Sequence, residues 1–188
     1  MQENNNTKAS SAIDLLVGRA INGDADAFGR LYDMHVDRVY RHVCYRVGSV
    51  ADAEDLTQQV FLRAWQAIHR YKKTAIPFLA WLIKISHNLV VDFYRSNKVV
   101  TYLDLDFVAG KSSSNPEHLA EARFEQQQMR RAILELPADQ QQVVMMRFIE
   151  GFSYSEIAAS ISKSEGAVRV ILHRALVKLR KILEKVKQ

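Results

Sequence analysis

The chain is poor in the features that mark secreted, membrane-spanning or disulfide-bonded proteins. It has one cysteine among 188 residues, so no internal disulfide is possible. Polar residues such as Lys84, His87 and Asn88 interrupt its longest apolar stretch well before the roughly 18 residues that a membrane span needs. The first eleven residues are polar and lack the apolar core of a signal peptide. These absences predict a cytoplasmic protein without membrane insertion.

Motifs typical of enzymes and metal sites are also missing. The sequence contains no glycine-rich phosphate-binding loop and no nucleophile motif. His42 and Cys44 lie close together, but they are two positions apart on a predicted helix and therefore face different ways. We expect no enzymatic activity, no catalytic residue, no metal and no cofactor.

The positive charge is concentrated at the C-terminal end. The formal net charge is +5, with 26 Lys and Arg against 21 Asp and Glu. Residues 147–188 alone contain nine Lys and Arg against four Asp and Glu, so the rest of the chain is close to neutral. A local excess of positive charge is typical of a surface that binds a polyanion, although a solvated helix face would have the same composition.

Apolar residues recur at spacings of three and four almost throughout, and no sustained alternation of period two occurs. We therefore predict an all-α protein with two small helical domains joined by a flexible linker. The predicted boundaries are an N-terminal tail and first helix over 1–22, a first domain over 23–96, a linker over 97–116 and a second domain over 117–188. The linker carries the serine-rich run 112–116, which ends in proline.

The strongest local pattern is a helix-turn-helix in the second domain. Ser153 followed by Glu156 predicts a capping box at the start of a helix over 154–161. Ser164 can cap a second helix over 165–185 after a short polar turn. The apolar spacing places Val168, Leu172, Ala175 and Leu179 inside and leaves Arg169, His173, Arg174 and Lys178 outside. A helix with an exposed N-terminus and outward basic residues suits the major groove of DNA. A hairpin that only packs against protein remains the alternative.

The first domain contains two patterns with a possible binding role. Acidic residues at the start of a helix near residue 51 complement the helix dipole, or form a partner surface. A later helix over 77–95 mixes aromatic, polar and basic residues, which can stack on unpaired bases and hold phosphates. Much of that helix shares apolar spacing and is also compatible with a simple core helix.

Several motifs taken in order resemble one family. They are Asp26-Ala27-Phe28, Asp52-Ala53-Glu54-Asp55-Leu56-Thr57-Gln58, Val60-Phe61-Leu62-Arg63-Ala64-Trp65, Phe78-Leu79-Ala80-Trp81-Leu82, Leu134-Glu135-Leu136-Pro137, Gly151-Phe152-Ser153-Tyr154-Ser155-Glu156 and Ser164-Glu165-Gly166-Ala167-Val168-Arg169. Over about residues 20 to 185 the chain resembles the extracytoplasmic-function (ECF) sigma factors of bacterial RNA polymerase.

The resemblance implies three sets of binding residues. The set for core polymerase is Asp52, Glu54, Asp55, Leu56, Gln59 and Phe61. The set for melted −10 DNA is Lys72, Lys73, Trp81, Lys84, His87, Asn88 and Arg95. The set for −35 duplex DNA is Ser164, Glu165, Gly166, Ala167, Arg169, His173, Arg174 and Lys178.

The resemblance further implies that the partners are core RNA polymerase, promoter DNA and an anti-sigma factor. The chain would direct promoter-specific initiation of transcription. Two other functions fit part of the sequence. A helix-turn-helix regulator that acts without polymerase would explain only the second domain, and a helical adaptor would bind protein alone and show no salt-dependent DNA binding.

Overall fold

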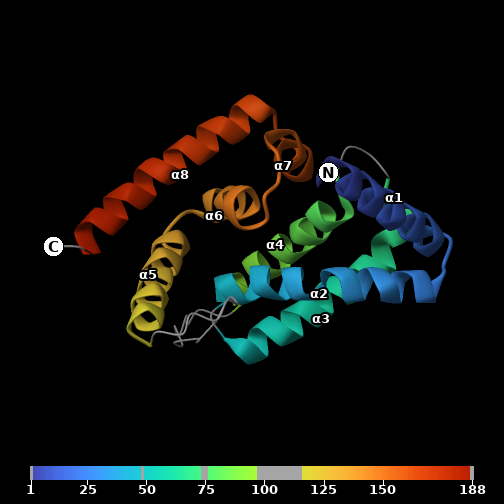
Figure 1. The fold of residues 1–188 in the computed structure, drawn as a ribbon, viewed down its shortest axis with the longest axis horizontal. Helices are drawn as coiled ribbons and strands as arrows, with labels where there is room; N and C mark the ends of the chain where they lie inside the picture. The colour runs from blue at the N-terminus through green and yellow to red at the C-terminus, as the bar shows by residue number, and fades with distance from the viewer. Residues whose placement is uncertain (1, 48, 73–75, 97–115, 187–188) are drawn as a thin grey trace.

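The computed structural model describes residues 2–47, 49–72, 76–96 and 116–186. Helices dominate the described residues, and no strand occurs among them, so the all-α prediction is confirmed. They form two helical units, which Figure 1 shows side by side. The first unit consists of α1 (Gln2–Ile21), α2 (Ala25–Val47), α3 (Val50–Ala67), the 3₁₀ turn η1 (Ile68–Arg70) and α4 (Phe78–Ser96).

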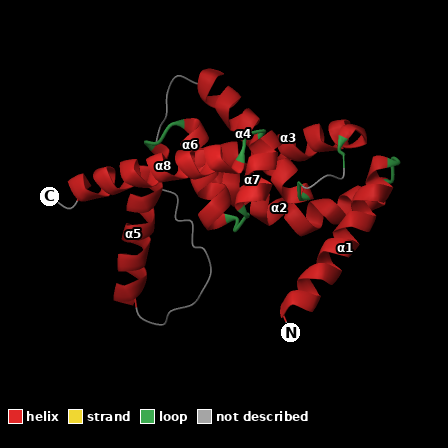
Figure 2. Ribbon diagram, turned by 90° about the horizontal axis from the view of Figure 1, so that it is seen from above, coloured by secondary structure: helices red, strands yellow, loops and turns green. Residues whose placement is uncertain are grey.

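The core of the first unit is made where α2, α3 and α4 pack against one another. Leu31, Val39 and Val43 of α2 are fully buried, as their spacing along the helix predicts. Val60 and Ala64 of α3 and the inner residues of α4 close the same core. The α1 helix crosses this bundle at its edge, as Figure 2 shows from above, and contributes Leu16, Val17 and Ala20.

Local signals set the helix boundaries in this unit. Gly23 has a φ of +89°, a left-handed conformation that costs glycine little, and it ends the turn after α1. Asp24 accepts a hydrogen bond from the Ala27 backbone N–H at 2.9 Å and so caps α2. Ser49 caps α3 in the same way through the Asp52 N–H. The α1 helix begins as early as Gln2, because no glycine or proline interrupts the polar residues at its start.

The second unit comprises α5 (Pro116–Leu134), α6 (Ala138–Val144), the π-helical segment η2 (Met145–Ile149), α7 (Tyr154–Ile161) and α8 (Glu165–Val186). The helical stretch between Pro137 and Gly151 is thus regular α-helix only in its first half. Gly151, with a φ of +75°, ends η2 and turns the chain toward α7. The predicted linker falls almost wholly outside the described residues, except for Pro116, which begins α5.

Candidate nucleic-acid interface

The α7–α8 hairpin has the helix-turn-helix form that the sequence predicts. Ser153 and Glu156 make both bonds of the capping box, since each side chain accepts from the other residue's backbone N–H. Ser162 ends α7 in a left-handed conformation, with a φ of 56°, and is the sole described non-glycine residue with positive φ. Ser164 accepts a hydrogen bond from the Ala167 N–H at 3.2 Å and caps α8. These local bonds fix the angle at which α8 leaves the turn.

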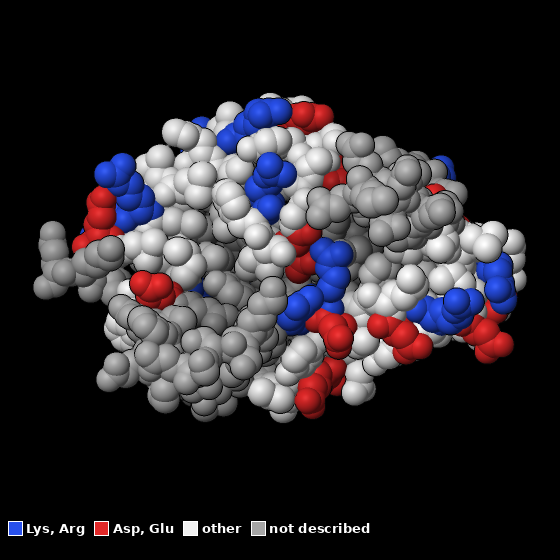
Figure 3. Space-filling view, viewed as in Figure 1, with Lys and Arg blue, Asp and Glu red and all other residues white. Residues whose placement is uncertain are grey.

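The two faces of α8 differ sharply in exposure. Val168, Leu172, Ala175 and Leu179 are buried against the rest of the second unit. The predicted −35 set lies on the other face, where all its members are exposed except Ala167, which is half-buried. Figure 3 shows Lys and Arg side chains along the edge that α8 forms. The exposed N-terminal turn and basic side chains can therefore reach a DNA groove without any change in the packing of α8.

Tyr154 holds Arg169 in place, a role that the sequence did not suggest. The Arg169 guanidinium lies 4.2 Å from the centre of the Tyr154 ring, and Arg147 lies 4.8 Å from the same centre. Glu165 adds an ion pair with Arg169 at 3.7 Å on the exposed surface, which contributes little stability. The ring and the carboxylate restrict the rotamers of Arg169 and so prepare it for a directed contact.

The predicted −10 residues on α4 do not share one environment. Asn88 and Arg95 are exposed, while Lys84 and His87 are half-buried. Trp81 is half-buried in an aromatic cluster, 5.0 Å from the Tyr71 ring and 5.6 Å from the Phe78 ring. Part of the indole therefore packs between the η1 turn and α4. Of the two lysines before α4, Lys72 is exposed and Lys73 lies outside the described residues.

His87 is part of a partly buried polar contact with α2. Its Nδ1 atom lies 3.1 Å from the guanidinium of Arg46, which is 2% exposed. Burial, followed by the nearby Arg46 charge, lowers the pKa of His87 to about 4. The imidazole is neutral at pH 7 and accepts from Arg46. His87 therefore offers DNA a neutral polar group rather than a positive charge.

The acidic stretch of α3 is divided between surface and core. Glu54 and Asp55 are exposed, and Gln59 donates to the Asp55 carboxylate at 2.6 Å. Asp52 is half-buried next to the Ser49 cap. Leu56 and Phe61 are each 4% exposed and belong to the core of the first unit. The side chains of this set that a partner can reach directly are thus the acids and Gln59.

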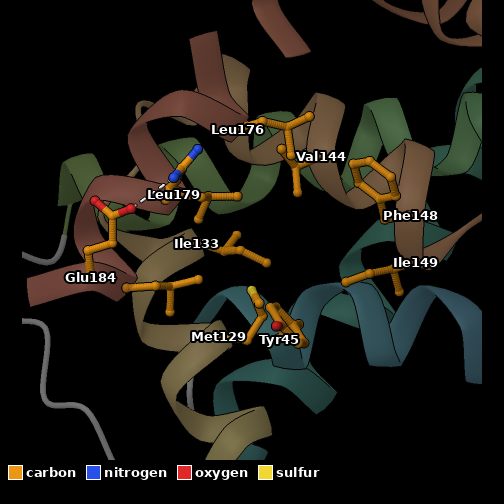
Figure 4. A pocket seen from close by; sticks show the side chains of 11 residues that line it. Tyr45, Met129, Ile133, Val144, Phe148, Ile149, Leu176, Leu179 and Glu184 are labelled. Carbon is orange, nitrogen blue, oxygen red and sulfur yellow. Dashed lines mark hydrogen bonds and ion pairs between the residues drawn. The ribbon is translucent and has the colours of Figure 1, made fainter. Parts of the chain in front are cut away.

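The second unit has an apolar pocket that the sequence did not predict. It measures about 610 Å³ and opens between α5, η2 and α8 beside Tyr45 of α2 (Figure 4). Phe148 and Ile149 on its wall are 61% and 45% exposed, and Leu176 is 43% exposed. Exposed apolar side chains in one place mark surfaces that bind protein. The adjacent apolar residues Phe148 and Ile149, which follow an arginine, were the only sequence feature that pointed to this surface. The π-helical geometry that turns both side chains outward is not visible in the sequence.

Within the described residues, no cluster of three or more metal-ligating side chains occurs. No helix among them is long and apolar enough to cross a membrane.

Two family models match the chain and together cover most of it. Residues 31–99 match Sigma-70 region 2, and residues 126–179 match Sigma-70, region 4. The first match includes most of α2 with α3 and α4, and the second includes the helix-turn-helix. The chain is therefore a sigma factor, a DNA-binding subunit that initiates transcription with RNA polymerase, and not an enzyme.

Individual relatives define the group more narrowly. The chain is 32% identical over 173 residues to the ECF RNA polymerase sigma factor SigW of Bacillus subtilis, covering 86% of this chain and 91% of SigW. It is 40% identical over 172 residues to the ECF RNA polymerase sigma factor BldN of Streptomyces coelicolor, covering 89% of this chain but 64% of BldN. The chain belongs to the ECF sigma factors.

Solved structures agree with this fold. CnrH, in its complex with the cytosolic domain of CnrY, has a TM-score of 0.70 and 26% identity, covering 93% of this chain and 98% of CnrH. The sigma factor RpoE of Bartonella quintana, in complex with the anti-sigma factor NepR, has a TM-score of 0.64 at 21% identity, covering 84% of this chain and 96% of RpoE. The second similarity supports the fold alone.

Proposed function

We propose that α8 reads the −35 element as duplex DNA while α4 captures one melted strand of the −10 element. The observation that carries this proposal is the two-faced α8, which is capped at an exposed N-terminus and presents Arg169, His173 and Arg174 outward. Arginine can donate two hydrogen bonds to guanine, and the helix N-terminus and Lys178 suit phosphates. Because polymerase and chromosomal DNA are cytoplasmic in bacteria, we also propose a cytoplasmic location.

Variants of α8 test the duplex role. Arg169→Ala and Arg174→Ala should each weaken −35 binding by about 1–3 kcal/mol if the side chain contacts a base. Lys185→Ala, at the far end of the same helix, removes an equal charge and should have a smaller, sequence-independent effect. The measurement is run-off transcription with core polymerase, on intact promoters and on templates opened in advance around the −10 element. Loss of activity on the opened template would assign α8 a different role.

We propose that core polymerase binds the exposed part of the acidic stretch of α3. Glu54 and Asp55 are accessible, and the Gln59 bond holds the Asp55 carboxylate in one orientation. Asp55→Lys should weaken association with core polymerase without loss of helix content, because Asp55 makes no core contact. Asp33→Lys, on the exposed surface of α2, is the matched charge control. If wild type and Asp55→Lys bind core polymerase with equal affinity, Asp55 is not part of the contact.

We propose that the apolar pocket makes a second contact with core polymerase. This contact would anchor the second unit near the −35 element. The wall residues Phe148 and Leu176 are apolar and exposed, which favours an apolar segment of a protein partner over DNA. Phe148→Glu should therefore weaken association with core polymerase but leave −35 duplex binding by the free chain unchanged. A normal polymerase affinity for a folded Phe148→Glu chain would contradict this contact.

We propose an anti-sigma factor as a further partner. The support is the family itself together with the similarity to CnrH, which was solved with the cytosolic domain of CnrY. The test is inhibition of run-off transcription by the product of a neighbouring gene, purified and added in equal amount to this chain.

A further inference from the structure

A small polar pocket of about 250 Å³ lies where α4 meets α6 and α7, three helices that Figure 1 shows next to one another. The polar side chains on its wall that bear on a ligand come from α4, from α6 and from the turn after α7. They are Lys84, His87, Asn88, Asp139, Gln142 and Lys163. This wall differs from that of the apolar pocket beside α5, and it suits a ligand that forms hydrogen bonds.

Two lysines bring positive charge to this pocket from opposite walls. Lys84 belongs to α4, and Lys163 belongs to the turn between α7 and α8. The Lys84 amine lies 3.5 Å from the Ser162 hydroxyl, and neither lysine pairs with a carboxylate within the described part of the chain. Both ammonium groups are therefore free to bind an anion between them.

Arg46 of α2 places a third cation behind the α4 wall. Its guanidinium is buried, and burial lowers its pKa to about 10, so it keeps its charge at pH 7. No carboxylate among the described residues pairs with it, and its Nε atom has no hydrogen-bond partner there. The side chain donates instead to His87 Nδ1 at 3.1 Å. Because a buried cation without a counterion is unfavourable, an anion next to His87 would stabilise Arg46.

His87 connects this buried cation with the pocket. An arginine side chain can only donate, so Nδ1 accepts from Arg46 and the neutral ring carries its proton on Nε2. No acceptor among the described residues takes this N–H, and the ring lines the pocket. An anion that accepts from Nε2 would also strengthen the bond from Arg46, since bonds in such a chain polarise one another.

Amide groups supply further donors on both walls. Gln142 of α6 is 6% exposed, and its side chain has no hydrogen-bond partner within the described ranges. A buried amide without a partner is costly, so a ligand that accepts from it is favoured. Asn88 of α4 is exposed and offers a second amide from the opposite wall. Donors on both sides suit an oxyanion that has several acceptor oxygens.

The balance of charge selects the ligand. Asp139 is the one carboxylate among the described residues that line the pocket, so the three cations exceed it by two positive charges. We propose that this pocket binds the phosphate group of a small molecule. A phosphate monoester carries close to two negative charges at pH 7 and has three strong acceptor oxygens. The proposal goes beyond the promoter-binding function and does not depend on any assignment to −10 DNA.

The test uses the full chain with inorganic phosphate as the probe. Titration calorimetry at pH 7 and constant ionic strength reports the affinity. Lys163→Ala should weaken phosphate binding about tenfold, because one charge-assisted hydrogen bond is lost. Asp139→Asn should tighten binding several-fold, because the repelling carboxylate is gone. Both residues are exposed, so we expect both variants to fold, which circular dichroism checks.

A matched control and a second ligand complete the test. Lys181→Ala removes an equal charge from α8 outside the pocket and should leave phosphate affinity unchanged. No phosphate binding by wild type, or equal losses in Lys181→Ala and Lys163→Ala, would overturn the proposal. A fluorescent single-stranded oligonucleotide distinguishes a free phosphate from the DNA backbone. If Lys163→Ala and Asp139→Asn alter oligonucleotide binding alone, the pocket belongs to a DNA surface and the proposal is wrong.

Discussion

Buried His42 should make the folded chain sensitive to mild acid. The ring has no exposed surface, and among the described residues neither ring nitrogen has a hydrogen-bond partner. Burial, and then the charge of Arg46, lowers the pKa of His42 to about 3. The Glu150 carboxylate lies 3.9 Å from Nδ1, beyond hydrogen-bonding distance, and does not offset the burial. The folded chain therefore keeps His42 neutral in mild acid, whereas the unfolded chain protonates it near pH 6.5.

The sign and size of the effect of pH on stability follow from this difference between the His42 pKa values of the folded and unfolded chain. Below pH 6.5 the unfolded state binds one more proton at His42, so the free energy of unfolding falls as pH falls, by up to about 1.4 kcal/mol per pH unit. From pH 7 to pH 5 the loss at His42 is about 2 kcal/mol. His35 and His87, whose pKa values burial lowers to about 4, act in the same direction. Glu150 opposes them, because burial raises its pKa and the folded state holds its proton more tightly.

His42→Leu isolates the contribution of one ring. Leucine has a similar volume, cannot titrate and needs no hydrogen bond, so stability at pH 7 should change little. Between pH 7 and pH 5 the variant should lose about 2 kcal/mol less than wild type in urea unfolding followed by circular dichroism. His69→Leu, at an exposed histidine of η1, should keep the wild-type acid sensitivity. Equal losses in wild type and His42→Leu would refute the reasoning.

Three further changes test other parts of the structure. Ser153→Ala removes the α7 cap and should lower the free energy of unfolding by about 1 kcal/mol in urea denaturation. Tyr154→Leu should weaken −35 binding in anisotropy measurements less than Arg169→Ala does, because the arginine remains but loses the ring that orients it; a larger effect would mean that Tyr154 itself contacts DNA. Lys72→Ala should reduce open-complex formation and lower its salt dependence by about one counterion, measured by permanganate footprinting, while unchanged footprints would leave Lys72 a solvated side chain.

The helix-turn-helix was predictable because its signals are local. The capping box joins Ser153 to a residue three positions away, and the apolar positions of α8 repeat every three or four residues. The same periodicity gave the helical class and most helix limits. The domain limits and the three sets of binding residues stay predictions, since neither spacing nor family resemblance measures a contact with DNA or polymerase.

The tertiary structure decided the contacts and the burial that involve residues far apart in the chain. Arg38 and Glu150 are 112 positions apart, and no local pattern shows that the second would be buried against the first. Leu56 and Phe61 belong to an acidic motif, yet the packing of α2 and α4 against α3 places both in the core. The exposure of His87 likewise depends on where α7 lies. Periodicity determines which side of a helix is apolar, but burial depends on which other element covers that side.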